Sequence, residues 1–367
     1  MLNRKRIFWL DTAKAYGIIL VFYGHIIERF EILGSSSMAY QHQIIYGFHI
    51  PLFFIVSGYF SKNFSLNLKQ RLSTRIVPFI FFNFCISLPL QIYSDLTNRV
   101  IQLPLYASGI VSILKASPVF NFMTWFLVCL FTVEIIDYLV NKYVISNIKT
   151  TNLNLNWWFM LAATMSYVIG ITVISNQEFF ISNTGIGLNF WFLHEAFVAY
   201  LFYKFGRVLN NIGIIEKCNS LFSNLFMIIA FSTIFWATIS LNSRVNMALS
   251  QHGNPIIFPI TAISGSLFAI FLARLTPQNS LILWVGRNTL ILIGTAGIFH
   301  HLINESYTRL IYPYIQHTDL VISLVSALGT IGSILFSVPI VYVLNKLLPQ
   351  LVGKPKISES FLPQLRD

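Results

Sequence analysis

The feature that most constrains this chain is a succession of apolar runs, each long enough to cross the ~30 Å hydrocarbon core of a bilayer as a helix. The runs cover residues 8–28, 44–60, 76–94, 123–141, 157–175, 190–209, 223–241, 255–273, 285–304 and 320–345. They predict an all-α, polytopic integral membrane protein with about ten transmembrane helices. A further apolar stretch at 101–122 is predicted to be an interfacial or re-entrant element.

The composition excludes a water-soluble fold. Hydrophobic residues make up 55% of the 367 residues, charged residues 10%, and the mean hydropathy is +0.68. A soluble domain carries about 25% charged residues, so this chain has too few charges to cover a globule in water. The same hydrophobicity excludes a disordered chain. We expect one membrane domain over residues 1–350 and a short cytoplasmic tail over 351–367.

The net charge of +11 has two interpretations: a surface for nucleic acid or another anionic partner, or the excess of Lys and Arg in the cytoplasmic loops of a membrane protein. With the N-terminus inside and ten alternating helices, 18 of the 24 basic residues fall on the cytoplasmic side and five on the other, Lys14 lying within the first run. This asymmetry predicts that both termini are cytoplasmic. It favours a lipid bilayer, and no nucleic acid, as the partner.

Ionisable side chains within membrane helices are costly, and they are usually paired or functional. In the first run, Asp11, Lys14 and His25 fall on one helical stripe about 60° wide. Asp11 and Lys14 have the i,i+3 spacing of an ion pair, which is either structural or part of a site. His25 follows Asp11 by about 21 Å along the axis, toward the non-cytoplasmic side. It is either a packing residue or a functional one.

The second run contains His49 followed by Pro51, and the proline frees a backbone carbonyl and favours a kink. His25 and His49 are expected at similar depth on adjacent helices, where they can form a site together. They can also bind a metal, but no carboxylate or third histidine is evident at the same depth, so no metal is predicted.

Other candidates lie further along the chain. Arg71 and Arg75 share a helical face and would make a phosphate clamp, or they only anchor a cytoplasmic loop. Trp125 opens a run at the outer interface, where an aromatic-belt anchor is the plainer interpretation. Glu134 and Glu195 are placed within the membrane and each requires a partner.

These motifs occur together in one order. The order is Asp11-x-x-Lys14, Gly24-His25, Phe48-His49-x-Pro51-Leu52-Phe53-Phe54, Ser57-Gly58-Tyr59, Arg71 with Arg75-x-x-Pro78, and Trp125-Phe126-Leu127. The chain resembles the bacterial membrane acyltransferase family three (acyltransferase 3), and within it the fucose 4-O-acetylase-like branch. The resemblance is dense over residues 6–130 and weak afterwards.

The resemblance implies a multi-pass protein of the bacterial inner membrane that transfers an acyl group, usually acetyl, from acyl-CoA to a hydroxyl of a cell-surface carbohydrate. The acceptor would be O-antigen, capsule, exopolysaccharide or a lipid-linked sugar, and acetyl-CoA would be a substrate, with no bound cofactor. His25 is implied as general base or acyl carrier. The other implied site residues are Asp11, Lys14 and His49 beside it, Arg71 and Arg75 for the phosphates of acyl-CoA, and Ser57, Tyr59 and Trp125 shaping the site.

Two points remain open. The branch carries a histidine about eight residues after the asparagine of a Gly-x-Asn-Ser/Thr-Leu segment, whereas here Ala296 follows Asn288 at that spacing and histidines occur only at His300 and His301. An exporter of a lipid-linked sugar or polysaccharide would also suit ten helices with charges within the membrane. The lack of an evident internal repeat, and motifs crowded into the first third of the chain, favour a single enzymatic site.

Overall fold

A computed structural model describes the chain over residues 7–35, 38–61, 67–99, 103–147, 152–184, 190–315, 318–356 and 360–362. Over these residues the chain consists of helices joined by turns and short irregular segments, and they contain no β-strand. The predicted all-α fold is confirmed. Each of the ten predicted runs falls on helical structure, because a helix satisfies the backbone N–H and C=O groups within its own segment.

The membrane-spanning character is confirmed as well. Six helical segments of the described part are long and apolar enough to cross a bilayer: Leu68–Thr97, Phe122–Tyr143, Leu155–Ser175, Leu221–Ile239, Ile257–Leu275 and Asp319–Leu347. A seventh span is formed if the bent pair Ser280–Arg287 and Thr289–Phe299, which meet at 78°, is taken as one. The count of ten spans and the cytoplasmic placement of both termini stay predictions.

The helices group into two compact units, each described by itself below. The first unit comprises residues 1–62, 202–292 and 300–335. Its elements are α1 (Phe8–Ile32), α2 (Met38–Tyr46), α3 (His49–Tyr59), α12 (Ile214–Lys217), α13 (Leu221–Ile239), η6 (Met247–Leu249), α14 (Ile257–Leu275), α15 (Ser280–Arg287), η7 (His300–Asn304), α17 (Glu305–Ile311) and η8 (Tyr312–Tyr314).

The second unit comprises residues 63–201, 293–299 and 336–367. Its elements are α4 (Leu68–Arg71), η1 (Leu72–Ile76), α5 (Val77–Ile80), η2 (Phe81–Ser87), α6 (Leu88–Thr97), α7 (Leu103–Leu114), η3 (Phe122–Thr124), α8 (Trp125–Tyr143), η4 (Ile145–Asn147), α9 (Asn152–Ser175), α10 (Gln177–Thr184), η5 (Phe190–Phe192) and η9 (Pro349–Val352). Three helices contribute residues to both units: α11 (Leu193–Ile212), α16 (Thr289–Phe299) and α18 (Asp319–Leu347).

Within the first unit, α1 packs against α2, α3, α14, α15 and α17. At the C-terminal end of α1, Ile26, Ile27 and Phe30 form an apolar cluster with Ile45 of α2 and Ile322 of α18. Because lipid is as apolar as these side chains, close van der Waals packing stabilises the cluster. The polar residues near this end of α1 are therefore carried by a helix whose other face is held firmly in the core.

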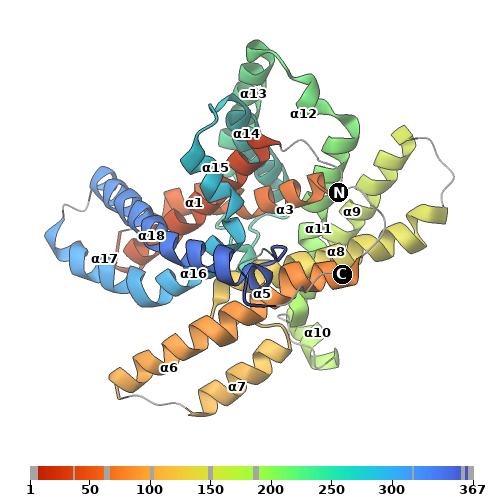
Figure 1. The fold of residues 1–367 in the computed structure, drawn as a ribbon. Helices are drawn as coiled ribbons and strands as arrows, with labels where there is room; N and C mark the ends of the chain where they lie inside the picture. Colours follow the sequence, from red (N-terminus) through yellow and green to blue (C-terminus); the bar gives the residue numbers. More distant parts are fainter. Residues whose placement is uncertain are drawn as a thin grey trace. The chain divides into compact units, whose positions relative to one another are not determined.

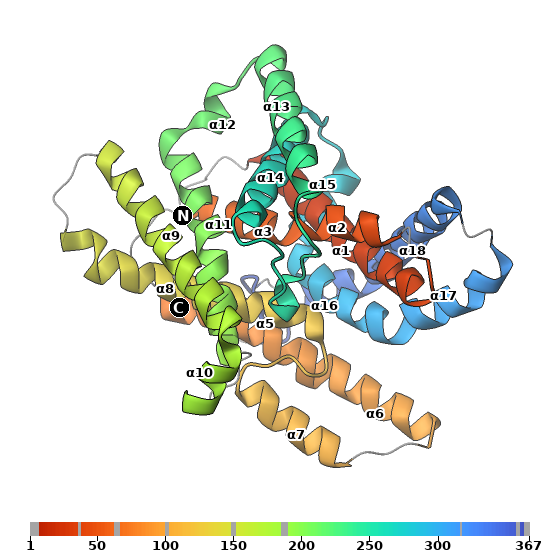
Figure 2. The same ribbon diagram turned by 180° about the vertical axis from the view of Figure 1, so that it is seen from behind.

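The helices α13 and α14 lie side by side in both views (Figures 1 and 2), and α14 packs in turn on α3 and α1. The contact of α3 with the first-unit part of α11 depends on a glycine. A Cβ atom at Gly58 would overlap the backbone carbonyl of Tyr203, so only glycine permits this approach of two helix backbones. The Ser57-Gly58-Tyr59 motif thus sits at a tight helix crossing.

Within the second unit, the continuous helical segment Leu68–Thr97 includes two π-helical stretches, η1 and η2. The helix α8 packs against η1 and α5. The segment predicted as an extra element contains α7, which runs beside α6 (Figures 1 and 2). Tyr106 of α7 donates its hydroxyl hydrogen to Asp95 Oδ2 of α6 at 2.5 Å.

The end of the second unit contains η9, which packs against α5 and η1. Gln350 in η9 is buried, and its side-chain amide donates to Ser360 Oγ at 3.3 Å and to the carbonyl of Leu362 at 2.8 Å. The predicted boundary between membrane domain and tail, after residue 350, therefore falls inside η9. The division into a domain and a tail stays a prediction.

Candidate active site

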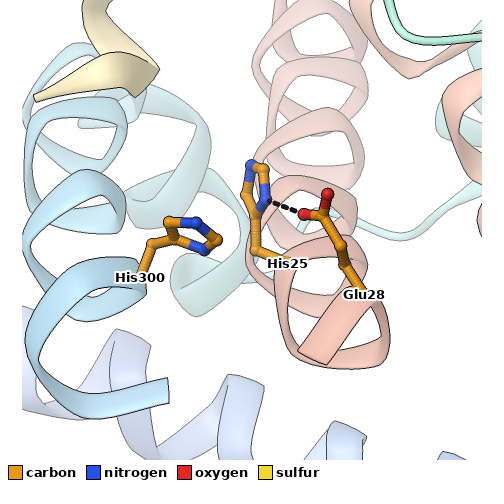
Figure 3. A group of neighbouring side chains, drawn as sticks. All are labelled: His25, Glu28 and His300. Atoms are coloured by element: carbon orange, nitrogen blue, oxygen red, sulfur yellow. Dashed lines mark hydrogen bonds and ion pairs between the residues drawn. The ribbon is translucent and has the colours of Figure 1, made fainter. Parts of the chain in front are cut away.

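Three titratable side chains meet at the C-terminal end of α1 in the first unit (Figure 3). His25 Nδ1 lies 3.1 Å from Glu28 Oε2, a contact that the i,i+3 spacing on α1 makes possible. The rings of His25 and His300 lie edge to face, with centroids 4.8 Å apart. The side chains of His25 and Glu28 are 15% and 23% exposed, so the cluster is shielded and still accessible.

His300 reaches this cluster because it begins η7, a π-helical turn that packs on α1. Single π-helical turns are rare within α-helices and occur often at functional sites. Ala296 lies where the resemblance led us to expect a histidine, and His300, four residues later, contacts His25. The side chain of His301 lies outside the described part.

Tyr46 of α2 stands among three histidines. Its hydroxyl lies 3.2 Å from His25 Nδ1, its ring stacks on His42 at a centroid distance of 3.7 Å, and its edge meets His49 at 4.8 Å. His49 Nδ1 donates to the backbone carbonyl of Ile45 at 2.8 Å. The two histidines predicted at similar depth are therefore both neighbours of Tyr46, and Tyr46 is the residue that bridges them.

His42 connects the polar network to Arg244 and, through it, to Glu31 at the end of α1. Arg244 donates from one terminal nitrogen to Glu31 Oε1 at 2.7 Å and from the other to His42 Nε2 at 3.5 Å. His42 lies in α2, outside the candidate spans. Burial in the first place, and then the charge of Arg244, lower the pKa of His42 from 6.5 to about 4. His42 is therefore neutral at physiological pH and accepts from Arg244.

The geometry around His25 defines which ring nitrogen is basic. An ionised carboxylate only accepts hydrogen bonds, so the nitrogen that faces Glu28, Nδ1, carries the proton. The other nitrogen, Nε2, then has the lone pair, and it points away from Glu28 (Figure 3). A histidine held in this tautomer by a carboxylate is suited to accept a proton at Nε2.

Arg29, which follows Glu28 on α1, approaches His300. One terminal nitrogen lies 3.3 Å from His300 Nε2 and 3.5 Å from its carbonyl oxygen. The other terminal nitrogen lies 3.8 Å from Glu305. The remaining donor, Nε–H, is buried and has no hydrogen-bond partner among the described residues.

The cluster also supplies the groups that a metal ion would need. One donor atom from each of His25, Glu28 and His300 lies within 4.8 Å of the others, and two imidazoles with a carboxylate suit several transition metals. The carboxylate and the further histidine that were not evident in the sequence are thus present. The guanidinium of Arg29, 3.3 Å from His300 Nε2, opposes a second cation at the same place, and this favours acid–base chemistry.

The other end of α1 carries the pair predicted between Asp11 and Lys14. Their charged atoms lie 2.7 Å apart, so the predicted ion pair is confirmed. Arg287 of α15 adds a second cation 3.7 Å from Asp11, and a Cβ atom at Gly286 would overlap the carbonyl of Asp11. This pair therefore joins α1 to α15, about 21 Å from His25 along the helix axis.

The residues expected to shape the site lie in both units. In the first unit Ser57 is half-buried, and Tyr59 is buried, with its hydroxyl hydrogen-bonded to Glu216 and its ring edge-on to Trp9. In the second unit Trp125 is 4% exposed and packs on Phe192 at a centroid distance of 5.6 Å. Trp125 is therefore a packing residue within the second unit. Its burial argues against an aromatic-belt position at the membrane interface.

Within the second unit, Arg71 and Arg75 converge on one carboxylate. Their guanidinium nitrogens lie 2.7 and 3.1 Å from Glu134 Oε1. Glu134 is 3% exposed, so the partner that this acidic residue required is the arginine pair. The cluster has two positive charges and one negative charge, and the arginines are 29% and 20% exposed.

One comparison with known proteins identifies the family of this chain. The model of the acyltransferase domain of the acyltransferase 3 family matches residues 7–345, which is nearly the whole chain. The fold and the site define a membrane-embedded acyltransferase, and the chain belongs to the acyltransferase 3 family. No curated protein and no solved structure gives a significant match to the chain.

Sequence reasoning missed Glu28, Arg29, Tyr46 and His300 as members of the cluster. For Glu28 a signal exists, because a carboxylate three residues after a histidine on a helix can reach its ring. Tyr46 and His300 carry no such signal. They come from segments distant in the chain, and only packing brings them to His25.

Proposed function

We propose that this acyltransferase is an O-acetyltransferase of the fucose 4-O-acetylase-like branch, which moves an acetyl group from acetyl-CoA to a hydroxyl of a cell-surface or lipid-linked carbohydrate. Membership of the acyltransferase 3 family supports the reaction class. The observation that supports the mechanism is the contact of 3.1 Å between His25 and Glu28. We place the protein in the bacterial inner membrane as a multi-pass enzyme.

In the proposed reaction His25 acts as a general base. Its Nε2 takes the proton of the acceptor hydroxyl while the hydroxyl oxygen forms a bond to the thioester carbonyl carbon, whose π electrons move to the carbonyl oxygen. The intermediate collapses, the carbon–sulfur bond breaks, and the thiolate of CoA receives the proton from His25. The products are the acetyl ester and CoA as a thiol. Glu28 keeps the proton on Nδ1 and stabilises the imidazolium.

A second route stays open, in which His25 carries the acyl group. Its Nε2 would attack the thioester and expel the thiolate, which forms an acyl-imidazolium. The acceptor oxygen then bonds to the acyl carbon while the carbon–nitrogen bond breaks, and the released Nε2 takes the hydroxyl proton, which passes on to the thiolate or to water. This route suits a donor on one side of the membrane and an acceptor on the other. Both routes need an unprotonated Nε2, and the contact of Nδ1 with Glu28 supports that state in either case.

For the donor, we propose that Arg71 and Arg75 bind phosphates of acetyl-CoA. Two guanidiniums against one carboxylate leave one net positive charge, and guanidinium forks are well matched to phosphate. Asp11 and Lys14 are proposed to anchor α1, and Glu28 is proposed as the group that orients His25. His49, Ser57 and Tyr59 are proposed to shape the first unit around His25, and Trp125 is proposed to shape the second unit.

The assignment of His25 is tested with a His25→Ala variant purified in nanodiscs, with acetyl transfer from acetyl-CoA to acceptor glycan followed by mass spectrometry. We expect kcat to fall by about 10²–10⁴-fold with the thermal unfolding midpoint unchanged. A His252→Gln variant, which alters a histidine in the loop between α13 and α14, serves as the control. Wild-type turnover by folded His25→Ala protein would refute the assignment. In cells, a gene deletion that lowers the amount of surface polymer and leaves the acetylation of the remaining polymer unchanged would instead indicate an exporter.

The donor proposal is tested with Glu134→Gln and with the triple variant Arg71→Gln, Arg75→Gln, Glu134→Gln. Removing the carboxylate together with the arginines avoids a buried unpaired charge. If the guanidiniums bind phosphate, the triple variant raises the KM for acetyl-CoA by about tenfold or more, an effect of roughly 1.4 kcal/mol or above. Glu134→Gln keeps or lowers the KM. A triple variant with wild-type donor affinity would show that the arginines serve only to neutralise Glu134.

A further inference from the structure

The proposed role of His25 as general base uses only some of the side chains in the cluster at the C-terminal end of α1. Glu28 and Tyr46 occupy the surroundings of His25 Nδ1, and neither is a cation. Arg29 and His300 lie beside His25, and the proposed reaction has not used either of them. An acyl transfer requires a second function as well, because the thioester carbonyl oxygen becomes negative in the transition state and needs donors aimed at it.

The contact between Arg29 and His300 determines the protonation of His300. A guanidinium has no acceptor atom, so the terminal nitrogen of Arg29, 3.3 Å from His300 Nε2, donates to a lone pair on that nitrogen. His300 is therefore the neutral tautomer with its proton on Nδ1. A neutral histidine whose N–H is a fixed donor can polarise a carbonyl group without taking the proton of the base.

Arg29 contributes a donor of its own. It lies four residues after His25, so that both side chains share one face of α1. Its terminal nitrogens contact His300 and Glu305, whereas its Nε–H is buried without a partner among the described residues. A buried N–H of a cation without an acceptor is unfavourable, and an anionic oxygen is the group that would satisfy it best.

We propose that Arg29 and His300 form the oxyanion-binding side of this active site. This proposal rests on the proposed function. When the acceptor oxygen, or His25 itself, attacks the thioester carbon, the π electrons move to the carbonyl oxygen. Arg29 Nε–H and His300 Nδ1–H donate to that oxygen, and the same electrons return when the carbon–sulfur bond breaks. His25 thus accepts and returns the proton. Arg29 and His300 stabilise the negative charge on the carbonyl oxygen.

The chain offers a matched control for Arg29. Arg309 pairs with the same carboxylate, its terminal nitrogen lying 2.7 Å from Glu305, and its side chain is 69% exposed. Arg29 and Arg309 therefore share an ion-pair partner, but only Arg29 also contacts His300. A substitution of either arginine removes one cation from Glu305, so a difference between the two variants measures what Arg29 does beyond that ion pair.

The experiment compares Arg29→Gln and Arg309→Gln in nanodiscs, with steady-state kinetics for acetyl-CoA and for the acceptor. Arg29→Gln is expected to lower kcat by about 10²–10³-fold, the usual effect of losing an oxyanion donor, with both KM values nearly unchanged. Arg309→Gln is expected to retain wild-type kinetics. Equal effects of the two substitutions would overturn the proposal. So would a raised acceptor KM with an unchanged kcat, which would assign Arg29 to an anionic group of the acceptor.

A second set of measurements covers the case in which Arg29→Gln folds poorly. Glu305→Gln keeps Arg29 and removes its ion pair, and it is expected to leave kcat unchanged. In Arg29→Ala, added guanidinium ion is expected to restore part of kcat in a saturable manner, which a structural role alone would not allow. His300→Ala is expected to lower kcat by at least tenfold. No rescue by guanidinium, together with an unchanged kcat in His300→Ala, would overturn the proposal.

The outcomes separate this inference from the proposed function. If His25→Ala abolishes transfer while Arg29→Gln and His300→Ala both keep a normal kcat, the acyltransferase site stands and the oxyanion assignment fails. If His25→Ala retains full transfer, the proposed site itself fails, whatever the arginine variants show.

Discussion

The two ends of α1 carry the same spacing of acid and base with different partners. Near the N-terminal end, Asp11 pairs with Lys14 at 2.7 Å, and near the C-terminal end His25 pairs with Glu28 at 3.1 Å, both with an i,i+3 separation. A lysine ammonium only donates hydrogen bonds, whereas an imidazole has one nitrogen that donates and one that accepts. The first pair is therefore a fixed ion pair, and the second can exchange a proton.

The neighbours of each pair increase this difference. At the N-terminal end, Arg287 adds a cation and Gly286 brings the backbone of α15 onto α1, so the charges join two helices. At the C-terminal end the added groups are a hydroxyl, an imidazole and a guanidinium, from Tyr46, His300 and Arg29. Helical spacing creates each pair, and the packed neighbours are the reason why we expect the first to stabilise the fold and the second to act in catalysis.

The largest expected effect is that of removing the carboxylate charge at the C-terminal end of α1. In Glu28→Gln, the side-chain amide can donate to His25 Nδ1, which moves the ring proton to Nε2 and removes the base. We expect kcat to fall by about 10²–10⁴-fold with little change in the thermal unfolding midpoint. Steady-state kinetics and thermal unfolding in nanodiscs measure the two quantities.

The matched variant is Asp11→Asn at the N-terminal end. It leaves the cations of Lys14 and Arg287 without their carboxylate, but their side chains are 26% and 39% exposed, so solvent screens part of the loss. We expect about 1–2 kcal/mol of destabilisation and an unchanged kcat. A larger kinetic effect for Asp11→Asn than for Glu28→Gln would reverse the comparison.

A comparable effect on stability is expected from Gly286→Ala, which tests whether the N-terminal end of α1 is a packing contact. The new Cβ atom would overlap the carbonyl of Asp11, so α15 and α1 must separate. The expected cost is about 1–3 kcal/mol, measured as a lower unfolding midpoint. Gly332→Ala on α18 is the control, because a Cβ atom there meets nothing within 4 Å and alanine favours a helix.

The smallest effect is a pH dependence near the C-terminal end of α1. His42 has its pKa lowered to about 4 in the folded protein, whereas the unfolded chain binds a proton near pH 6.5. The unfolded state therefore binds more protons in this window, and stability falls by about 1 kcal/mol per pH unit as the pH drops from 6.5 toward 4. His42→Gln should flatten this slope and leave stability at pH 8 nearly unchanged. Identical slopes for the two proteins in thermal unfolding would contradict this assignment.

Much of the fold could be predicted because it depends on local properties of the sequence. Apolar runs long enough to span a bilayer become helices wherever they occur, since backbone groups in lipid must be satisfied within the segment. The bend of 78° between α15 and α16 and the π-helical turn at His300 were not predicted. Both involve a few residues whose conformation is selected by the helices packed around them.

What the sequence by itself determined was the helical, membrane-spanning class and the ion pair of Asp11 with Lys14, which follow from hydropathy and from spacing along one helix. The family resemblance singled out His25, and its catalytic role stays a prediction. Only the tertiary structure decided that Tyr46 and His300 meet His25, that Arg29 contacts His300, and that Arg71 and Arg75 share Glu134. Such contacts join segments far apart in the chain, and their geometry follows from the packing of helices, which no local pattern encodes.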